Sequence, residues 1–188
     1  MQATHQPDPS AAASSAPSLL REAFHDLHGA RLHGFAQLLT LGDRRRAAGL
    51  ASGALSAASA DLATLRHPER AAAWLRAHVV RHAGRRVPDL PVADRIAGLA
   101  DLEVSSAALA GLAALDVRGR AAVIATHVER LDRRDVATVV GQDGQRLERL
   151  VQRSIERYLA GHGAVTGDTP PSGPIAERVR AASARVMA

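Results

Sequence analysis

Apolar residues recur every three or four positions along most of the chain from about residue 19, which is the spacing of helices that bury one side. The spans with this spacing are 19–41, 44–65, 69–83, about 92–102, 105–115 and a further one that Asp116 introduces. The first span is either one long helix or two short ones broken near Gly29, since glycine weakens a helix interior. The pattern therefore predicts a chain built from helices.

Two more helical patterns follow, and a turn that contains Gly141 joins them. Asp132 is placed to cap the first, and Asp143 to cap the second, which continues to about Ala160. Each has one apolar face, formed by Val136, Val139 and Val140 in the first and by Leu147, Leu150, Val151, Ile155, Tyr158 and Leu159 in the second. This order of cap, helix, glycine turn and helix predicts a helix-turn-helix without winged elements.

The second of these helices has a basic side opposite its apolar face. Its candidate DNA-binding residues are Gln145, Arg146, Arg149, Arg153 and Arg157. The arginines lie three or four positions apart, so at about 100° per residue they form one stripe. Such a stripe is what contact with phosphates and base edges in a major groove requires, and we predict that it binds DNA. The alternative is an ordinary solvated helix face.

Composition narrows the class of fold and of partner. Alanine supplies much of the 46% hydrophobic content and aromatic residues are only 2%, which favours an all-α protein of closely packed helices over a β-sandwich. A net charge of +5 and a pI near 11.2 favour an anionic partner such as nucleic acid. All 24 basic residues are arginine, however, and a GC-rich genome also produces that bias.

The absence of cysteine excludes disulfides and thiolate metal sites. The amino terminus lacks the pattern of a signal peptide, and no run of eighteen apolar residues occurs. We therefore expect a soluble cytoplasmic protein with no membrane partner.

Prolines and changes of composition predict the domain organisation. The expected parts are a disordered N-terminus (1–18), a helical domain (19–86), a linker (87–104), a helix-turn-helix domain (105–160) and a flexible tail (161–188). Within the tail, a short amphipathic helix is expected from the spacing of Ile175, Val179, Ala182 and Val186.

The order of these segments resembles a bacterial RNA polymerase sigma factor of the extracytoplasmic-function group. In the second half the resemblance rests on Leu112, Leu115, Arg120 and Ile124, then on VERLDRRDVATVVG (128–141) and QRLERLVQRS (145–154). In the first half it rests on LGDRRRAAGLASGAL (41–55) and PERAAAWLRAHVVRHAGRR (68–86). It implies a promoter-melting helical domain, a helix-turn-helix domain, and DNA, core RNA polymerase and an anti-sigma protein as partners.

The resemblance also implies roles for individual residues. The residues to which it assigns polymerase binding are Leu50, Ser52 and Leu55. Those to which it assigns promoter melting are Trp74, Arg76, Arg81 and Arg85. Family members carry acidic residues and a glutamine around the leucine of the second helix, where this chain has Gly49, Ala51, Ser52 and Gly53. The segment 145–154 corresponds to the family's recognition helix, and where that helix has a lysine this chain has Glu148. These departures predict weakened contact with polymerase and altered contact with DNA.

No catalytic motif stands out. His78 and His82 are four apart on one helix, but no third ligand is evident, so we predict no metal site and no cofactor. A G-x-S-x-G elbow and a phosphate-binding lysine loop are both absent, and we predict that the chain is not an enzyme. Two functions remain: a sigma-like factor that recognises promoters and initiates transcription with RNA polymerase, and a protein-interaction adaptor or decoy on a degenerate sigma scaffold.

Overall fold

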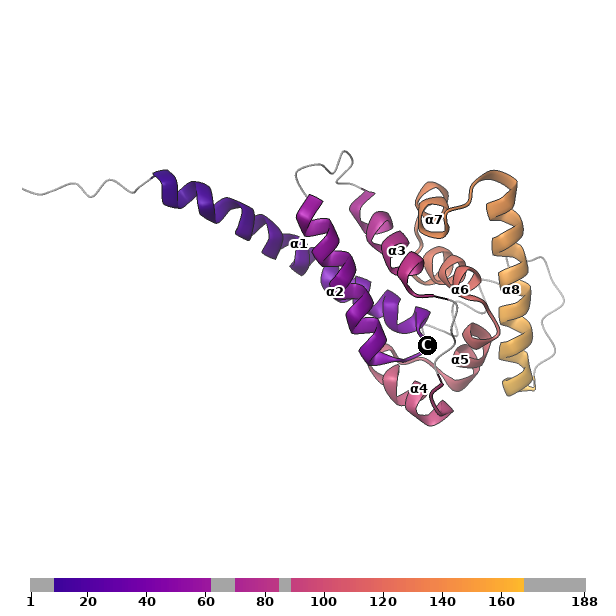
Figure 1. Cartoon of the computed structure of the whole chain (residues 1–188). Helices are drawn as coiled ribbons and strands as arrows, with labels where there is room; N and C mark the ends of the chain where they lie inside the picture. Colours follow the sequence, from indigo (N-terminus) through magenta and orange to yellow (C-terminus); the bar gives the residue numbers. More distant parts are fainter. Residues whose placement is uncertain (1–8, 62–69, 85–88, 168–188) are drawn as a thin grey trace, which may run out of the picture.

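The computed structural model describes residues 9–61, 70–84 and 89–167, which form helices and turns with no β-strand among them (Figure 1). The helices are α1 (Pro9–Leu39), α2 (Arg44–Asp61), α3 (Ala71–His82), α4 (Val92–Gly98), η3 (Ala100–Leu102), α5 (Ser106–Ala113), α6 (Val117–Val123), η4 (Ile124–Val128), α7 (Arg133–Val140) and α8 (Gly144–Thr166). The prediction of an all-α protein is confirmed.

Short polar side chains fix where three of the helices begin. The side chains of Ser105, Asp116 and Asp132 accept hydrogen bonds from backbone N–H groups three residues later, at 3.1, 2.7 and 2.8 Å. Each bond satisfies an amide that the first turn of a helix leaves without a partner. The predicted cap at Asp132 is confirmed.

Several boundaries differ from the expected ones. Helix α1 begins at Pro9 and continues past Gly29 to Leu39, so residues 9–18, which we expected to lack structure, are helical. Helix α8 continues to Thr166, so the first residues of the expected tail are helical as well. The amphipathic segment 175–186 lies outside the described residues.

The expected linker packs against the first half of the chain. Within it, α4 and η3 lie beside the turn between α1 and α2, where a Cβ added at Gly98 would be 1.9 Å from the carbonyl oxygen of Gly42. Arg44 at the start of α2 donates hydrogen bonds to the Asp101 carboxylate at 2.9 Å and to the Ala97 carbonyl at 3.1 Å. These contacts hold residues 97–101 in place.

The buried apolar residues of the two halves form a continuous cluster that includes Leu32, Phe35, Leu75, Val79, Ile124, Val136 and Val139. Helix α3 lies along α7 in this arrangement, and α1 approaches α6 and η4 (Figure 1). The expected separation into two domains with independent cores is therefore not confirmed, because residues far apart in the sequence complete one another's burial.

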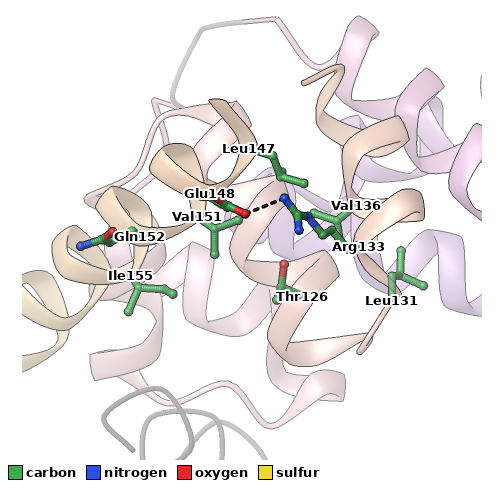
Figure 2. Close-up of a pocket in the computed structure, with 9 residues that line it drawn as sticks. All are labelled: Thr126, Leu131, Arg133, Val136, Leu147, Glu148, Val151, Gln152 and Ile155. Carbon is green, nitrogen blue, oxygen red and sulfur yellow. Dashed lines mark hydrogen bonds and ion pairs between the residues drawn. The ribbon is translucent and has the colours of Figure 1, made fainter. Parts of the chain in front are cut away.

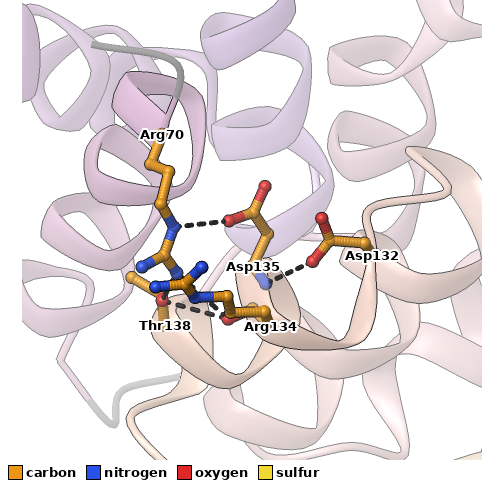
Figure 3. A network of polar contacts seen from close by, with 5 residues as sticks. All are labelled: Arg70, Asp132, Arg134, Asp135 and Thr138. Atoms are coloured by element: carbon orange, nitrogen blue, oxygen red, sulfur yellow. Dashed lines mark hydrogen bonds and ion pairs between the residues drawn. The ribbon is translucent and has the colours of Figure 1, made fainter. Parts of the chain in front are cut away.

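Two arginines of the first half form ion pairs with the second half. Arg70 donates to the Asp135 carboxylate at 3.1 Å and to the Thr138 hydroxyl at 2.6 Å, across the α3–α7 contact (Figure 3). Arg76, whose exposed fraction is 4%, pairs with Glu129 and also donates to the Ala72 carbonyl at 2.9 Å. Arg76 therefore joins the two halves from inside the core.

Arg120 is the largest side chain that the fold buries almost completely, with an exposed fraction of 2%. Its guanidinium donates to the backbone carbonyls of Leu112 at 3.0 Å, Leu115 at 2.9 Å and Leu39 in α1. Burial lowers its pKa to about 10, which still leaves the side chain charged at neutral pH. A single cation thus ties together the ends of α1 and α5 and the turn that follows α5.

Candidate nucleic-acid interface

Helices α7 and α8 are joined by a three-residue turn of Gly141, Gln142 and Asp143. Gly141 ends α7 in the left-handed conformation, with φ of 65°, which favours glycine because it has no Cβ. Asp143 stands at the expected cap position in an extended conformation, but its side chain makes no capping hydrogen bond. Its backbone carbonyl instead accepts from the N–H groups of Arg146 and Leu147, both at 3.1 Å.

Close contacts at two glycines bring α8 against α5 and α6. A Cβ added at Gly111 would lie 2.7 Å from the ring of Tyr158, and one at Gly119 would lie 2.7 Å from the hydroxyl of Ser154. The buried residues of α8 are Leu147, Ser154, Ile155, Tyr158, Leu159 and His162. These contacts fix which side of α8 faces the protein and therefore which side faces solvent.

The solvent side of α8 is the predicted basic face. Gln145, Arg146, Arg149, Arg153 and Arg157 are all exposed, so the structure brings the five candidate residues together on one surface, here called the arginine row. Arg149 donates to the Gln145 side chain and Arg153 to the Arg149 carbonyl, each at 3.1 Å. Within the described part of the chain, no ion pair involves the four arginines of the row.

Glu148 does not face the arginine row. Its carboxylate pairs with Arg133 at the start of α7 (Figure 2). On a helix of 3.6 residues per turn, Glu148 lies more than 100° from the middle of the row. Glu148 therefore has a cationic partner and lies away from the arginine row, and the altered contact with DNA expected from the sequence stays a prediction. Sequence reasoning missed this pair because Arg133 and Glu148 belong to different helices.

The residues assigned to polymerase binding are divided between surface and core. Ser52 is exposed, Leu50 is half-buried, and Leu55 is buried with an exposed fraction of 6%. Leu55 therefore contributes to packing and is not accessible to a partner in this structure. Gly49 and Gly53 on the same helix have open space around them.

The residues assigned to promoter melting are also separated. Arg81 is exposed and Trp74 is half-buried, whereas Arg76 is buried and paired with Glu129, so its guanidinium does not reach the surface. Arg85 lies outside the described residues. The rings of His78 and His82 stack with centroids 4.1 Å apart, and no group of three metal-binding side chains gathers in the described ranges.

A second feature of α8 was not anticipated from the sequence. An apolar groove of about 390 Å³ runs beside α8 on the side away from the arginine row, and Figure 2 shows its walls. It is lined by Thr126, Leu131, Arg133, Val136, Leu147, Glu148, Val151, Gln152 and Ile155. The sequence places Val136, Leu147, Val151 and Ile155 on apolar faces and cannot show that α7, η4 and α8 leave a gap between them.

Comparison with known proteins adds no relative: no family model matches the chain, and neither a curated protein nor a solved structure matches it. None of the described helices has the length and apolar character needed to cross a membrane.

Proposed function

We propose that this chain binds DNA through the arginine row of α8, as a sigma-like regulator that recognises promoters and initiates transcription together with RNA polymerase. The observation that carries the proposal is the exposed row itself, on the second of two helices joined by a three-residue turn, with the opposite face of that helix buried. Arginine suits this task because its planar guanidinium reaches phosphate and guanine edges with paired donors. The resemblance to extracytoplasmic-function sigma factors supports the step from DNA binding to initiation in the cytoplasm, with an anti-sigma protein as regulator.

The first test removes three charges from the row. The triple variant Arg146→Ala, Arg149→Ala, Arg153→Ala is expected to lower the slope of log affinity against log salt by about three units, since each phosphate contact contributes close to one. Fluorescence anisotropy with random and genomic duplexes at several salt concentrations measures this slope.

The control variant has the same net charge but keeps the row. Arg31, Arg45 and Arg118 are exposed on α1, α2 and α6, and replacing them with alanine also removes three positive charges. We expect this control to retain most of the slope. If both triple variants bound DNA alike, total charge rather than the arginine row would govern binding, and the proposal would fail.

A second candidate function, an adaptor or decoy without polymerase contact, is favoured by the surface of α2. Where the family has acidic and amide groups, this chain exposes only Gly49, Ser52 and Gly53. Loss of a paired charged or hydrogen-bonding group at an interface costs about 2–5 kcal/mol, and 1.4 kcal/mol changes affinity tenfold. The parent chain is therefore expected to bind core polymerase weakly.

A binding titration with purified core polymerase decides between these candidates. The variant Gly49→Asp, Ser52→Gln, Gly53→Glu is expected to bind about a hundredfold or more tightly than the parent, given the losses above. A Cβ added at either glycine has nothing within 4 Å, so the first atom of each new side chain meets no steric barrier. Tight binding by the parent, with no gain in the variant, would exclude the adaptor and favour an ordinary initiator.

A further inference from the structure

A cavity of about 600 Å³ lies between α3, α6 and α7, away from the apolar groove beside α8. The three helices are neighbours in the fold, so residues far apart in the sequence share the walls of the cavity (Figure 1). Its apolar lining consists of Ala77, Val80, Val117, Val139 and Val140. A cavity of this size and lining can enclose a small organic molecule.

Two arginines that line the cavity have no partner. Arg81 of α3 and Arg118 of α6 are both exposed, and within the described ranges neither guanidinium donates a hydrogen bond or forms an ion pair. Other arginines on or next to these helices do have acceptors: Arg70 and Arg76 donate to carboxylates, and Arg120 donates to backbone carbonyls. The donors of Arg81 and Arg118 are therefore available to an anion that enters the cavity.

The other polar groups of the lining are already engaged. One carboxylate oxygen of Asp116 accepts from the N–H of Gly119 at 2.7 Å, which caps α6, and the charge of Asp116 also interacts with that of the buried Arg120. The hydroxyl of Thr138 accepts from Arg70 at 2.6 Å (Figure 3). The cavity thus has two uncompensated positive charges beside an apolar wall.

We propose that this cavity binds a small organic phosphate, in which a phosphate monoester is joined to an apolar body. A monoester carries a charge of about −1.5 to −2 at pH 7, which matches the two guanidinium groups. Each planar guanidinium can donate two parallel hydrogen bonds to phosphate oxygens, and this geometry favours arginine for phosphate. The apolar body packs against the valines of α3, α6 and α7.

The bound phosphate links the two halves of the chain, because Arg81 belongs to the first half and Arg118 to the second. It adds to the Arg70–Asp135 pair, which joins α3 and α7 directly. Binding should therefore raise the melting temperature of the protein. None of the residues of the arginine row lines the cavity, so an occupied cavity leaves that row free for DNA.

Calorimetric titration of the full chain with 1-naphthyl phosphate, in a buffer without phosphate, tests the proposal. Arg81→Ala and Arg118→Ala are each expected to weaken binding about tenfold or more, since each removes charge-assisted hydrogen bonds to the phosphate. Arg45→Ala is the matched control, because Arg45 is exposed on α2 and the substitution removes the same charge. The control should bind the probe as the parent does. Equal binding by the parent and both cavity variants, or an equal loss in the control, would overturn the proposal.

Two further ligands separate the contributions of the phosphate and the apolar body. Inorganic phosphate and 1-naphthoate should each bind about tenfold or more weakly than 1-naphthyl phosphate, since one lacks the body and the other carries a single charge. Inorganic phosphate that binds as tightly as the probe would exclude a role for the apolar wall, and 1-naphthoate that does so would exclude selection for phosphate. Either result would overturn the proposal.

The variant Ala77→Phe fills part of the apolar wall and keeps both arginines. It should reduce the affinity for 1-naphthyl phosphate to that for inorganic phosphate, and circular dichroism checks that each variant is folded. The triple alanine variant of the arginine row should bind the probe as the parent does, so failure of DNA binding and failure of this site are distinguishable. If the double variant Arg81→Ala, Arg118→Ala lowered the salt slope for DNA by about two units and left probe binding unchanged, the pair would belong to a DNA surface and the proposal would be overturned.

Discussion

Replacing Arg120 with leucine is expected to remove a large share of the free energy of unfolding of the protein. The substitution removes the donors of three buried carbonyl groups, those of Leu39, Leu112 and Leu115, and puts an apolar side chain against them. A buried acceptor left unsatisfied costs about 1–3 kcal/mol. The Leu112 carbonyl keeps a second donor, the N–H of Leu115, so the other two carbonyls make the expected loss in free energy of unfolding about 2–6 kcal/mol. The total free energy of unfolding of a small protein is only about 5–15 kcal/mol.

Urea denaturation followed by circular dichroism measures this loss. Arg118→Leu is the matched control, because Arg118 lies two residues earlier on α6 and is exposed. Arg118→Leu should change the free energy of unfolding by no more than about 0.5 kcal/mol, as most surface substitutions do. Buried ion pairs are often replaceable by apolar residues, but the partners of Arg120 are backbone groups that no substitution removes. A loss below about 1 kcal/mol in Arg120→Leu would mean that the three carbonyls find other donors.

The substitution Gly111→Ala is expected to loosen α5 from α8, whereas the same substitution at Gly49 stabilises the protein. A Cβ at Gly111 meets the Tyr158 ring at 2.7 Å and the Tyr158 carbonyl oxygen at 2.9 Å, and the oxygen belongs to a backbone that cannot turn aside. Overpacking of this kind costs about 1–3 kcal/mol. At Gly49, in the exposed middle of α2, nothing lies within 4 Å, and alanine improves helix propensity by about 1 kcal/mol.

Thermal melts of the two variants should therefore move in opposite directions, by about 2–4 °C per kcal/mol for a chain of this size. Gly111→Ala should also weaken the proposed binding of DNA, because α5 packs against the buried face of α8, and α8 carries the arginine row on its opposite face. Melting temperatures that rise in both variants would show that α5 and α8 separate easily and that their close approach contributes little to stability.

Much of the secondary structure could be predicted from the sequence because its signals are local. Ser105, Asp116 and Asp132 cap helices that begin within one residue of them, and Gly141 ends α7. The arginine row follows from spacing alone once the apolar face of α8 is known. For these features a window of about ten residues contains all the information that matters.

The contacts between the two halves could not be predicted in this way. Arg76 and Arg120 are chemically identical to the exposed arginines, and only the position of distant carboxylates and carbonyls makes them core residues. Leu55 could equally be a buried or an exposed leucine of α2. The groove beside α8 depends on how η4, α7 and α8 pack together, and the residue pattern of any one helix does not contain that information. Burial of charge and gaps in packing are properties of the assembled fold.

The hydrogen bond from Arg120 to the carbonyl of Leu39 spans 81 residues of sequence, and this separation has a consequence for synthesis on the ribosome. Helix α1 emerges without the guanidinium that binds its last turn, and α3 emerges without Glu129, the partner of Arg76. At a synthesis rate of about 5–20 residues per second, about 4–16 s pass between the addition of Leu39 and the addition of Arg120. During that interval Leu32, Phe35 and Leu39 lack their final cover, and this is the period in which the nascent chain has the greatest need of a chaperone.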